Sequence, residues 1–206
     1  SLAVVNCIFL NSNTGITTES YIGQYHLWLK NCTFSNTITA IAAKFDEFYC
    51  TQCHFQNCTT GIHAELTVFL KIEQSDFDNV KMPMHFISVY LAILDKSYFN
   101  NYINAGMYVY SIIDIKSCTF SNSRSSSIYS LESRIYLEGN VSFSNGYSIG
   151  YGGALYLSSS TIVLIAPVSV SFTNNTAQLG GGAIYSAYEN SNLYCFFVLY
   201  DKKTLN

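Results

Sequence analysis

The residues that could carry acid–base chemistry in this chain are few and scattered. Asp76 and Asp78 flank Phe77, and the basic residues Arg124 and Arg134 lie far along the chain from them. Enzymes that cleave polysaccharides need clustered carboxylates, with basic groups beside them, around one bond. A single pair also supplies too few oxygens for calcium. We therefore interpret the pair as a solvated edge, and we predict no catalytic residue.

Cysteine is the second residue type with possible chemistry, since the chain holds seven. Cys50-x-x-Cys53 has the spacing of half a zinc site, but no second ligand pair follows at the usual separation. We therefore expect no metal and no cofactor. Most of the cysteines are interpreted as buried thiols that pack as small apolar side chains. A disulfide between Cys32 and Cys53 stays open, if the two stand one above the other.

An internal repeat sets the spacing of these residues. The pentapeptide CTFSN occurs at 32–36 and again at 118–122. The motif Phe-x-Asn begins at Phe9, Phe34, Phe55, Phe77, Phe99, Phe120, Phe143 and Phe172. The first and last of these are 163 positions apart, which gives seven steps of about 23 residues. Such regular spacing predicts a repeat fold.

Alternating segments such as Leu27-x-Leu29 and Ile113-x-Ile115 stand upstream of the phenylalanines. Alternation at period two indicates strands with one buried face, and no helical period is present. About three short strands per repeat are typical of one coil of a parallel β-solenoid. We predict an all-β parallel β-helix of about eight coils with about 21–29 residues per coil. The phenylalanines should stack in its core.

A column of outward side chains follows from this register. Seven or eight places after each Phe, or further on where the loop is longer, stand Ile16, Ile41, Ile62, Met84, Met107, Ile128, Leu155 and Ile184. The next residue on a strand points outward. We therefore predict an exposed ladder of rings at His63, His85, Tyr108, Tyr129, Tyr156 and Tyr185. The ladder either stabilises parallel strands by stacking, or forms a binding surface for sugars, a partner solenoid or a covering segment.

Four Asn-x-Ser/Thr sequons begin at Asn31, Asn57, Asn140 and Asn174. They are glycan acceptors only in a secreted eukaryotic chain, and only where they face solvent. Asn57 and Asn174 belong to the Phe-x-Asn column, whose amides we expect to point inward and to bond along a ladder. Asn31 and Asn140 precede Phe by three places, at a turn. Glycosylation is therefore predicted at Asn31 and Asn140.

The last two repeats also carry GGALY at 152–156 and GGAIY at 181–185. Together with Phe-x-Asn, and with VSFTNNTAQLGGGAIYS at 170–186, they resemble the polymorphic outer-membrane-protein repeats of chlamydial type. More broadly the chain resembles right-handed parallel β-helix proteins of the pectate-lyase-like class. The resemblance implies a right-handed solenoid and an extracellular or cell-surface protein. It implies no chemistry, because solenoids include both enzymes and inert scaffolds.

Composition excludes several classes of function. Charged residues make up 11% of the chain and the net charge is −3, so no basic face for nucleic acid is expected. No apolar run approaches the ~20 residues of a membrane span. The repeat is already present at Cys7, and residues 1–6 do not show the pattern of a signal peptide. We expect residues 1–206 to form one β-helix domain that is a piece of a longer chain.

These observations favour an extracellular structural or adhesive scaffold, a segment of a fibre or of a large surface protein, without enzymatic activity. The expected partners are carbohydrate or other surface proteins, and end-to-end self-association is a further expectation because open coils expose strand edges. The alternative is a carbohydrate-binding or carbohydrate-active β-helix protein. A groove lined by carboxylates would favour an enzyme, whereas an uninterrupted surface with aromatics would favour the scaffold.

Overall fold

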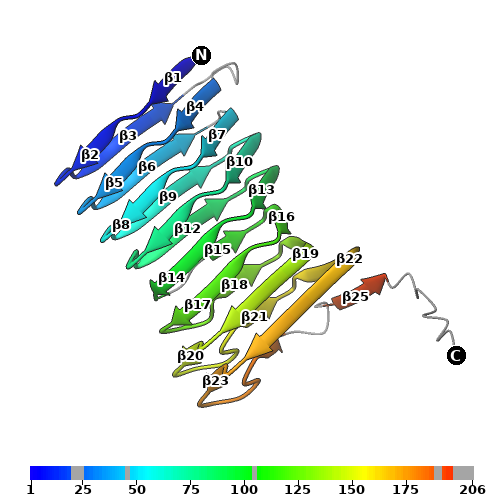
Figure 1. The fold of residues 1–206 in the computed structure, drawn as a ribbon. Coiled ribbons are helices and arrows are strands. Elements are labelled where there is room, and N and C mark those ends of the chain that lie inside the picture. Colours follow the sequence, from blue (N-terminus) through cyan, green and yellow to red (C-terminus); the bar gives the residue numbers. More distant parts are fainter. Residues whose placement is uncertain (20–25, 45–46, 104–105, 188–191, 197–206) are drawn as a thin grey trace, which may run out of the picture.

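The coils of the predicted solenoid are visible directly in the computed structural model, which describes residues 1–19, 26–44, 47–103, 106–187 and 192–196. Every regular element among these residues is a β-strand, and every pairing between strands is parallel. Strands of successive coils lie side by side along one axis (Figure 1). The all-β parallel solenoid is confirmed.

The strands fall into three columns. The first column holds β1 (Leu2–Val5), β4 (His26–Lys30), β7 (Glu47–Thr51), β10 (Phe69–Glu73), β13 (Leu91–Asp95), β16 (Ile112–Lys116) and, at its end, β25 (Asn192–Phe196). The second holds β2 (Ile8–Leu10), β5 (Thr33–Ser35), β8 (His54–Gln56), β11 (Asp76–Asp78), β14 (Tyr98–Tyr102) and β17 (Thr119–Ser123). The long strands β19 (Arg134–Ser144) and β22 (Thr161–Thr173) span both columns. The third is an eight-stranded sheet of β3 (Thr14–Glu19), β6 (Thr39–Lys44), β9 (Thr60–Glu65), β12 (Met82–Ile87), β15 (Gly106–Val109), β18 (Ile128–Leu131), β21 (Leu155–Ser158) and β24 (Ile184–Ala187).

The described part of the chain therefore contains six coils built from three separate strands. In two further coils the first two strands merge into one. These two coils also carry the short strands β20 (Tyr147–Ser148) and β23 (Thr176–Ala177), which pair with each other. The longer loops around 145–154 and 174–183 form this extra layer, and both contain the double glycine.

The phenylalanines of Phe-x-Asn form one continuous stack through the core. Their rings are nearly parallel, with centroids 4.4 to 5.3 Å apart between neighbouring coils. Phe34 to Phe143 are buried, and Phe9 and Phe172 are partly buried against the same core. Cross-coil ring contacts of this kind add about 0.5–1.5 kcal/mol each to the free energy of burial. The predicted core stack is confirmed.

Each full coil turns at corners whose central residue has a positive φ near 50°, the left-handed region. The corner after the second strand is asparagine in every coil: Asn11, Asn36, Asn57, Asn79, Asn101, Asn122, Asn145 and Asn174. The other two corners accept varied residues, such as Gln52, Lys96, Leu66 and Tyr110. Asparagine is favoured because its short polar side chain tolerates this conformation better than other non-glycine residues. The conserved spacing of Phe-x-Asn thus reflects one core residue and one corner.

Small polar residues next to the corners satisfy backbone groups inside the core. The Ser111 hydroxyl accepts a hydrogen bond from the Val89 backbone N–H at 3.1 Å and donates to the Val109 carbonyl at 2.9 Å. The Cys32 thiol likewise donates to the Lys30 carbonyl at 3.4 Å. Buried backbone groups need such partners. Six cysteines are free thiols: Cys7, which is half-buried, and Cys32, Cys50, Cys53, Cys58 and Cys118, which are buried.

The fifth coil departs from the predicted register. Met84 pairs with Gly106, where the sequence pattern had placed Met107. Tyr108 therefore aligns with Phe86 and is 0% exposed, so its predicted place in the outward ladder was wrong. The cause is the missing side chain at Gly106: a Cβ there would collide with the Tyr108 ring, which fills the space instead. Burial raises the pKa of the Tyr108 hydroxyl.

Candidate binding surface

The outward face of the third column carries the rings that the sequence predicted, in two separate runs. Tyr129 stacks on Tyr156 with ring centroids 4.8 Å apart, and Tyr156 on Tyr185 at 5.5 Å. Tyr151, on the adjacent loop, stacks on Tyr185 at 4.1 Å. These ladder tyrosines are half-buried, so their edges are available to a partner. The fifth coil, where Tyr108 turns inward, separates them from the histidines.

The second run is a pair of histidines on neighbouring strands. His63 of β9 and His85 of β12 are register partners, and their Nδ1 atoms are 3.1 Å apart. One ring donates to the other at this distance, so at least one of the two Nδ1 atoms carries no proton. Burial, and then the charge of His63, lower the pKa of His85. The surroundings of His85 therefore disfavour its protonated form.

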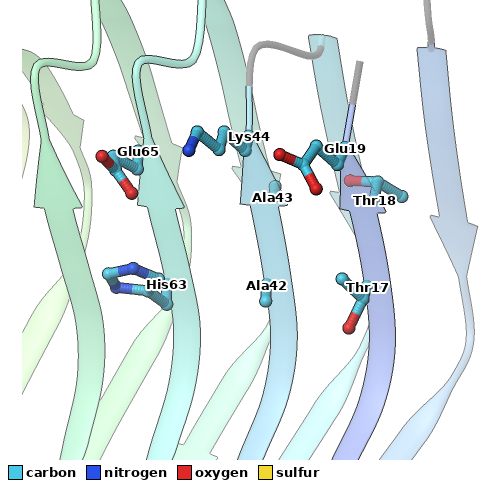
Figure 2. Close-up of a pocket in the computed structure, with 8 residues that line it drawn as sticks. All are labelled: Thr17, Thr18, Glu19, Ala42, Ala43, Lys44, His63 and Glu65. Atoms are coloured by element: carbon cyan, nitrogen blue, oxygen red, sulfur yellow. The ribbon is translucent and has the colours of Figure 1, made fainter. Parts of the chain in front are cut away.

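A hollow is lined by His63 on the side away from His85 along the sheet (Figure 2). One row of its lining is Thr17, Ala42 and His63, and the other is Glu19, Lys44 and Glu65. The methyl group of Ala42 between two larger side chains creates the depression. The second row alternates in charge from coil to coil, which stabilises the parallel ladder.

A further aromatic surface, on the first column, was not predicted. Trp28 is 49% exposed and stacks on Tyr49 with centroids 4.0 Å apart, and Tyr49 contacts Phe69 at 5.4 Å. The His26 Nδ1 lies 2.8 Å from the Glu47 carboxylate beside this stack. The signal was available, because these rings alternate with the buried residues of HLWLK, EFYCT and FLKIE. The sequence analysis had predicted outward-facing residues only for the third column.

The acidic residues do not gather into a catalytic pair. Asp76 lies 3.0 Å from the His54 Nδ1, and Asp78 accepts a hydrogen bond from the Asn100 amide at 2.9 Å. Lys116 bridges Asp114 and Glu138 on the first column, at 3.1 and 2.7 Å. Asp76 and Asp78 thus have separate partners, whereas Asp114 and Glu138 share Lys116. Among the described residues, no three His, Cys, Asp or Glu side chains are arranged to hold a metal ion.

The sequons are placed differently from the prediction. Asn57 and Asn174 were expected to point inward, but both are exposed, so this expectation was wrong. The left-handed corner turns the amide toward solvent, where Asn79 donates to the Asn57 Oδ1 at 2.6 Å. The amide ladder itself is present, on the outside. Asn31 and Asn140 are exposed as well, and their glycosylation stays a prediction.

The distinctive residues of the last coil, a second asparagine and paired glycines, each have a structural role. The Asn175 amide accepts a hydrogen bond from the Gly146 N–H and donates to the Phe143 carbonyl, both at 2.9 Å. This side chain therefore ties the longer loop to the coil before it. Gly152 and Gly181 have φ of +62° and +63°, and a Cβ at either would collide with backbone. The glycines and the second asparagine are thus required by the loop geometry.

Residues 169–187 match the sequence pattern of the Chlamydia polymorphic membrane protein repeat. The matched stretch contains Asn175 and Gly181, which confirms the resemblance seen in the sequence. Comparison with curated proteins and with solved structures gives no match. No helix among the described residues is long and apolar enough to cross a membrane. The repeat and the solenoid fit a structural protein exposed at a surface.

Proposed function

We propose that this chain is a non-enzymatic scaffold displayed outside the cell, and that it adheres to carbohydrate or to other surface proteins. The observation that carries the proposal is the match at 169–187 to a repeat of the Chlamydia polymorphic membrane proteins, because it supports a location at a membrane surface. The continuous Phe stack supports it, since a rigid rod can hold binding groups at fixed spacing.

The adhesive surfaces are the two outward aromatic stacks. Trp28 with Tyr49 on the first column and Tyr129 with Tyr156 on the third present amphipathic rings on rigid strands. Aromatic rings of this kind bind sugar faces and anchor protein interfaces at little entropic cost. The polar contact between His26 and Glu47 beside Trp28 supplies groups of the type that orient a sugar hydroxyl.

A glycan array probed with the fluorescently labelled chain tests adhesion to carbohydrate. Trp28→Ala should weaken binding at the first column, and Tyr129→Ala should weaken it at the third. Asn79→Gly, at a corner away from both stacks, is the matched control and should bind as the wild type does. Binding that is unaffected by both ring substitutions would contradict the assignment of these surfaces.

Antibody labelling of intact cells from the native source tests the location. Labelling without permeabilisation is expected, and labelling only after permeabilisation would overturn the surface assignment. Release of shortened glycans by the purified chain would instead support the carbohydrate-active alternative. Mass spectrometry of the same native material would map sugar at Asn31 and Asn140.

A further inference from the structure

We propose that His63 and His85 together bind a divalent transition-metal ion of the zinc or nickel type. The two imidazoles stand on adjacent strands of the third column, with their Nδ1 atoms 3.1 Å apart. The proposal does not depend on the adhesive function above, because it rests on this pair alone.

The separation of the two nitrogens suits a shared ion. Zinc binds imidazole nitrogen at ~2.0–2.1 Å, so two ligands of a tetrahedral ion lie about 3.3 Å from each other. The observed distance is within a few tenths of an ångström of this value, and a small rotation of either ring supplies the difference. Water would complete the coordination. The hollow beside His63 gives an ion an open approach, and Glu65 lines the same hollow (Figure 2).

The backbone beneath the pair is rigid. Ile62 and Ala64, which flank His63, are fully buried, and so are Met84 and Phe86, which flank His85. The strands β9 and β12 each pair with a neighbour on both sides. Ligands on such elements are held closer to one geometry than ligands on loops, so less ordering is needed when the ion binds.

The other histidines of the chain show what is particular about this pair. His26 faces the carboxylate of Glu47 at 2.8 Å and His54 faces that of Asp76 at 3.0 Å, whereas His63 and His85 face each other. The Nδ1 atoms of His26 and His54 are thus already engaged by carboxylates, whereas, among the described residues, those of the pair are engaged only by each other. His63 and His85 face each other across neighbouring strands, so both Nδ1 atoms lie where one ion can reach them.

Isothermal titration of the untagged chain with zinc chloride, and separately with nickel chloride, at pH 7.5 tests the site. We expect one ion per chain. His63→Gln and His85→Gln should each weaken binding by about tenfold or more, because loss of a supporting group alone commonly costs 10–100-fold. His54→Gln is the control, since it removes a more exposed imidazole from another column and should leave the affinity unchanged. Circular dichroism verifies that each variant is folded.

Three results would overturn the proposal. The first is no binding of either ion by the wild-type chain at millimolar concentration. The second is unchanged binding by the double variant His63→Gln/His85→Gln, which would place the ion on the thiols of the core. The third is an equal loss in His54→Gln, which would indicate unspecific binding to surface imidazoles. Acidification should also release the ion, because protons compete with it for the imidazole nitrogens.

Discussion

At the scale of single residues, stability depends most on side chains that fill one level of the core. Phe99 lies between Phe77 and Phe120, 4.8 Å from each ring centroid, and is fully buried. Its neighbours are held by their own coils, so they cannot close a gap between them. The cost of removing such a ring therefore includes the cavity as well as the lost contacts.

Phe99→Ala should lower the free energy of unfolding by about 3–5 kcal/mol. Phe69→Ala is the matched control, because it removes the same ring from the outward face of the first column, where a cross-strand pair contributes about 0.2–1 kcal/mol. Urea denaturation measures both. Equal losses in the two variants would show that Phe99 is not an internal part of the stack.

The histidine pair makes a second prediction, about pH. The pKa of His85 is lowered in the folded chain, so between this value and about 6.5 the unfolded chain binds a proton that the folded chain does not. Stability must then fall as the pH is lowered through 6.5. In metal-free buffer, His85→Gln should lose less stability than the wild type between pH 7.5 and 5.5. Parallel stability profiles for the two proteins would contradict this.

At the scale of elements, the corners decide where each strand ends. Asn79 has a φ of 53°, donates its amide to Asn57 and accepts from Asn101 at 3.2 Å. Asn79→Ala loses these bonds. It also places alanine, which has a Cβ but no polar side chain, in the left-handed region, and this backbone conformation costs about 1–2 kcal/mol. Asn79→Gly loses the same bonds without that strain. The glycine variant should thus be the more stable by about 1 kcal/mol in thermal or urea unfolding.

The reverse order of stability in these two variants would show that the amide ladder does not depend on the left-handed corner. The pair of substitutions is informative because both remove the side-chain bonds. The two variants differ only in the free energy that the left-handed backbone conformation costs.

The strands and inward residues were predictable because each coil repeats the same alternation. The register of the fifth coil was not predictable. Met107 is the same residue type as Met84, so a shift of the strand pairing by one residue could not be recognised from spacing alone. A glycine gives no apolar signal, and Tyr108 in the core replaces the missing volume from the next inward position. The direction of the asparagines was also missed, since it depends on the sign of φ at the corner rather than on a strand period.

The site was predicted in part for the same reason. His63, His85, Tyr129, Tyr156 and Tyr185 follow from one strand register, and the structure places them on one face. Their stacking distances and the contact between the two Nδ1 atoms depend on rotamers, which the order of residues does not determine.

At the scale of the whole molecule, each coil contacts only the coils before and after it, and stability is a sum of such contacts. Phe9 in the first coil is only partly buried, whereas Phe99 at the equivalent position of the fifth coil is 0% exposed. Hydrogen exchange should therefore be slowest in the strands from β7 to β17 and faster in β2 and β24 of the isolated chain. Peptide-resolved mass spectrometry measures this, and uniform protection would indicate one cooperative unit instead.

The three corners and the inward columns also affect how fast related sequences diverge. Folding constrains every second strand residue and the corner positions, while the column shared by Thr17, Ala42, His63 and Tyr129 has accepted four unlike side chains without a change of backbone pairing. Selection for the fold alone does not constrain the residues of such outward columns. Homologues of this chain should therefore diverge rapidly in surface residues while their coils still superpose. Detectable ancestry would then persist in single repeats with the strictest loop geometry, and residues 169–187 are of that kind.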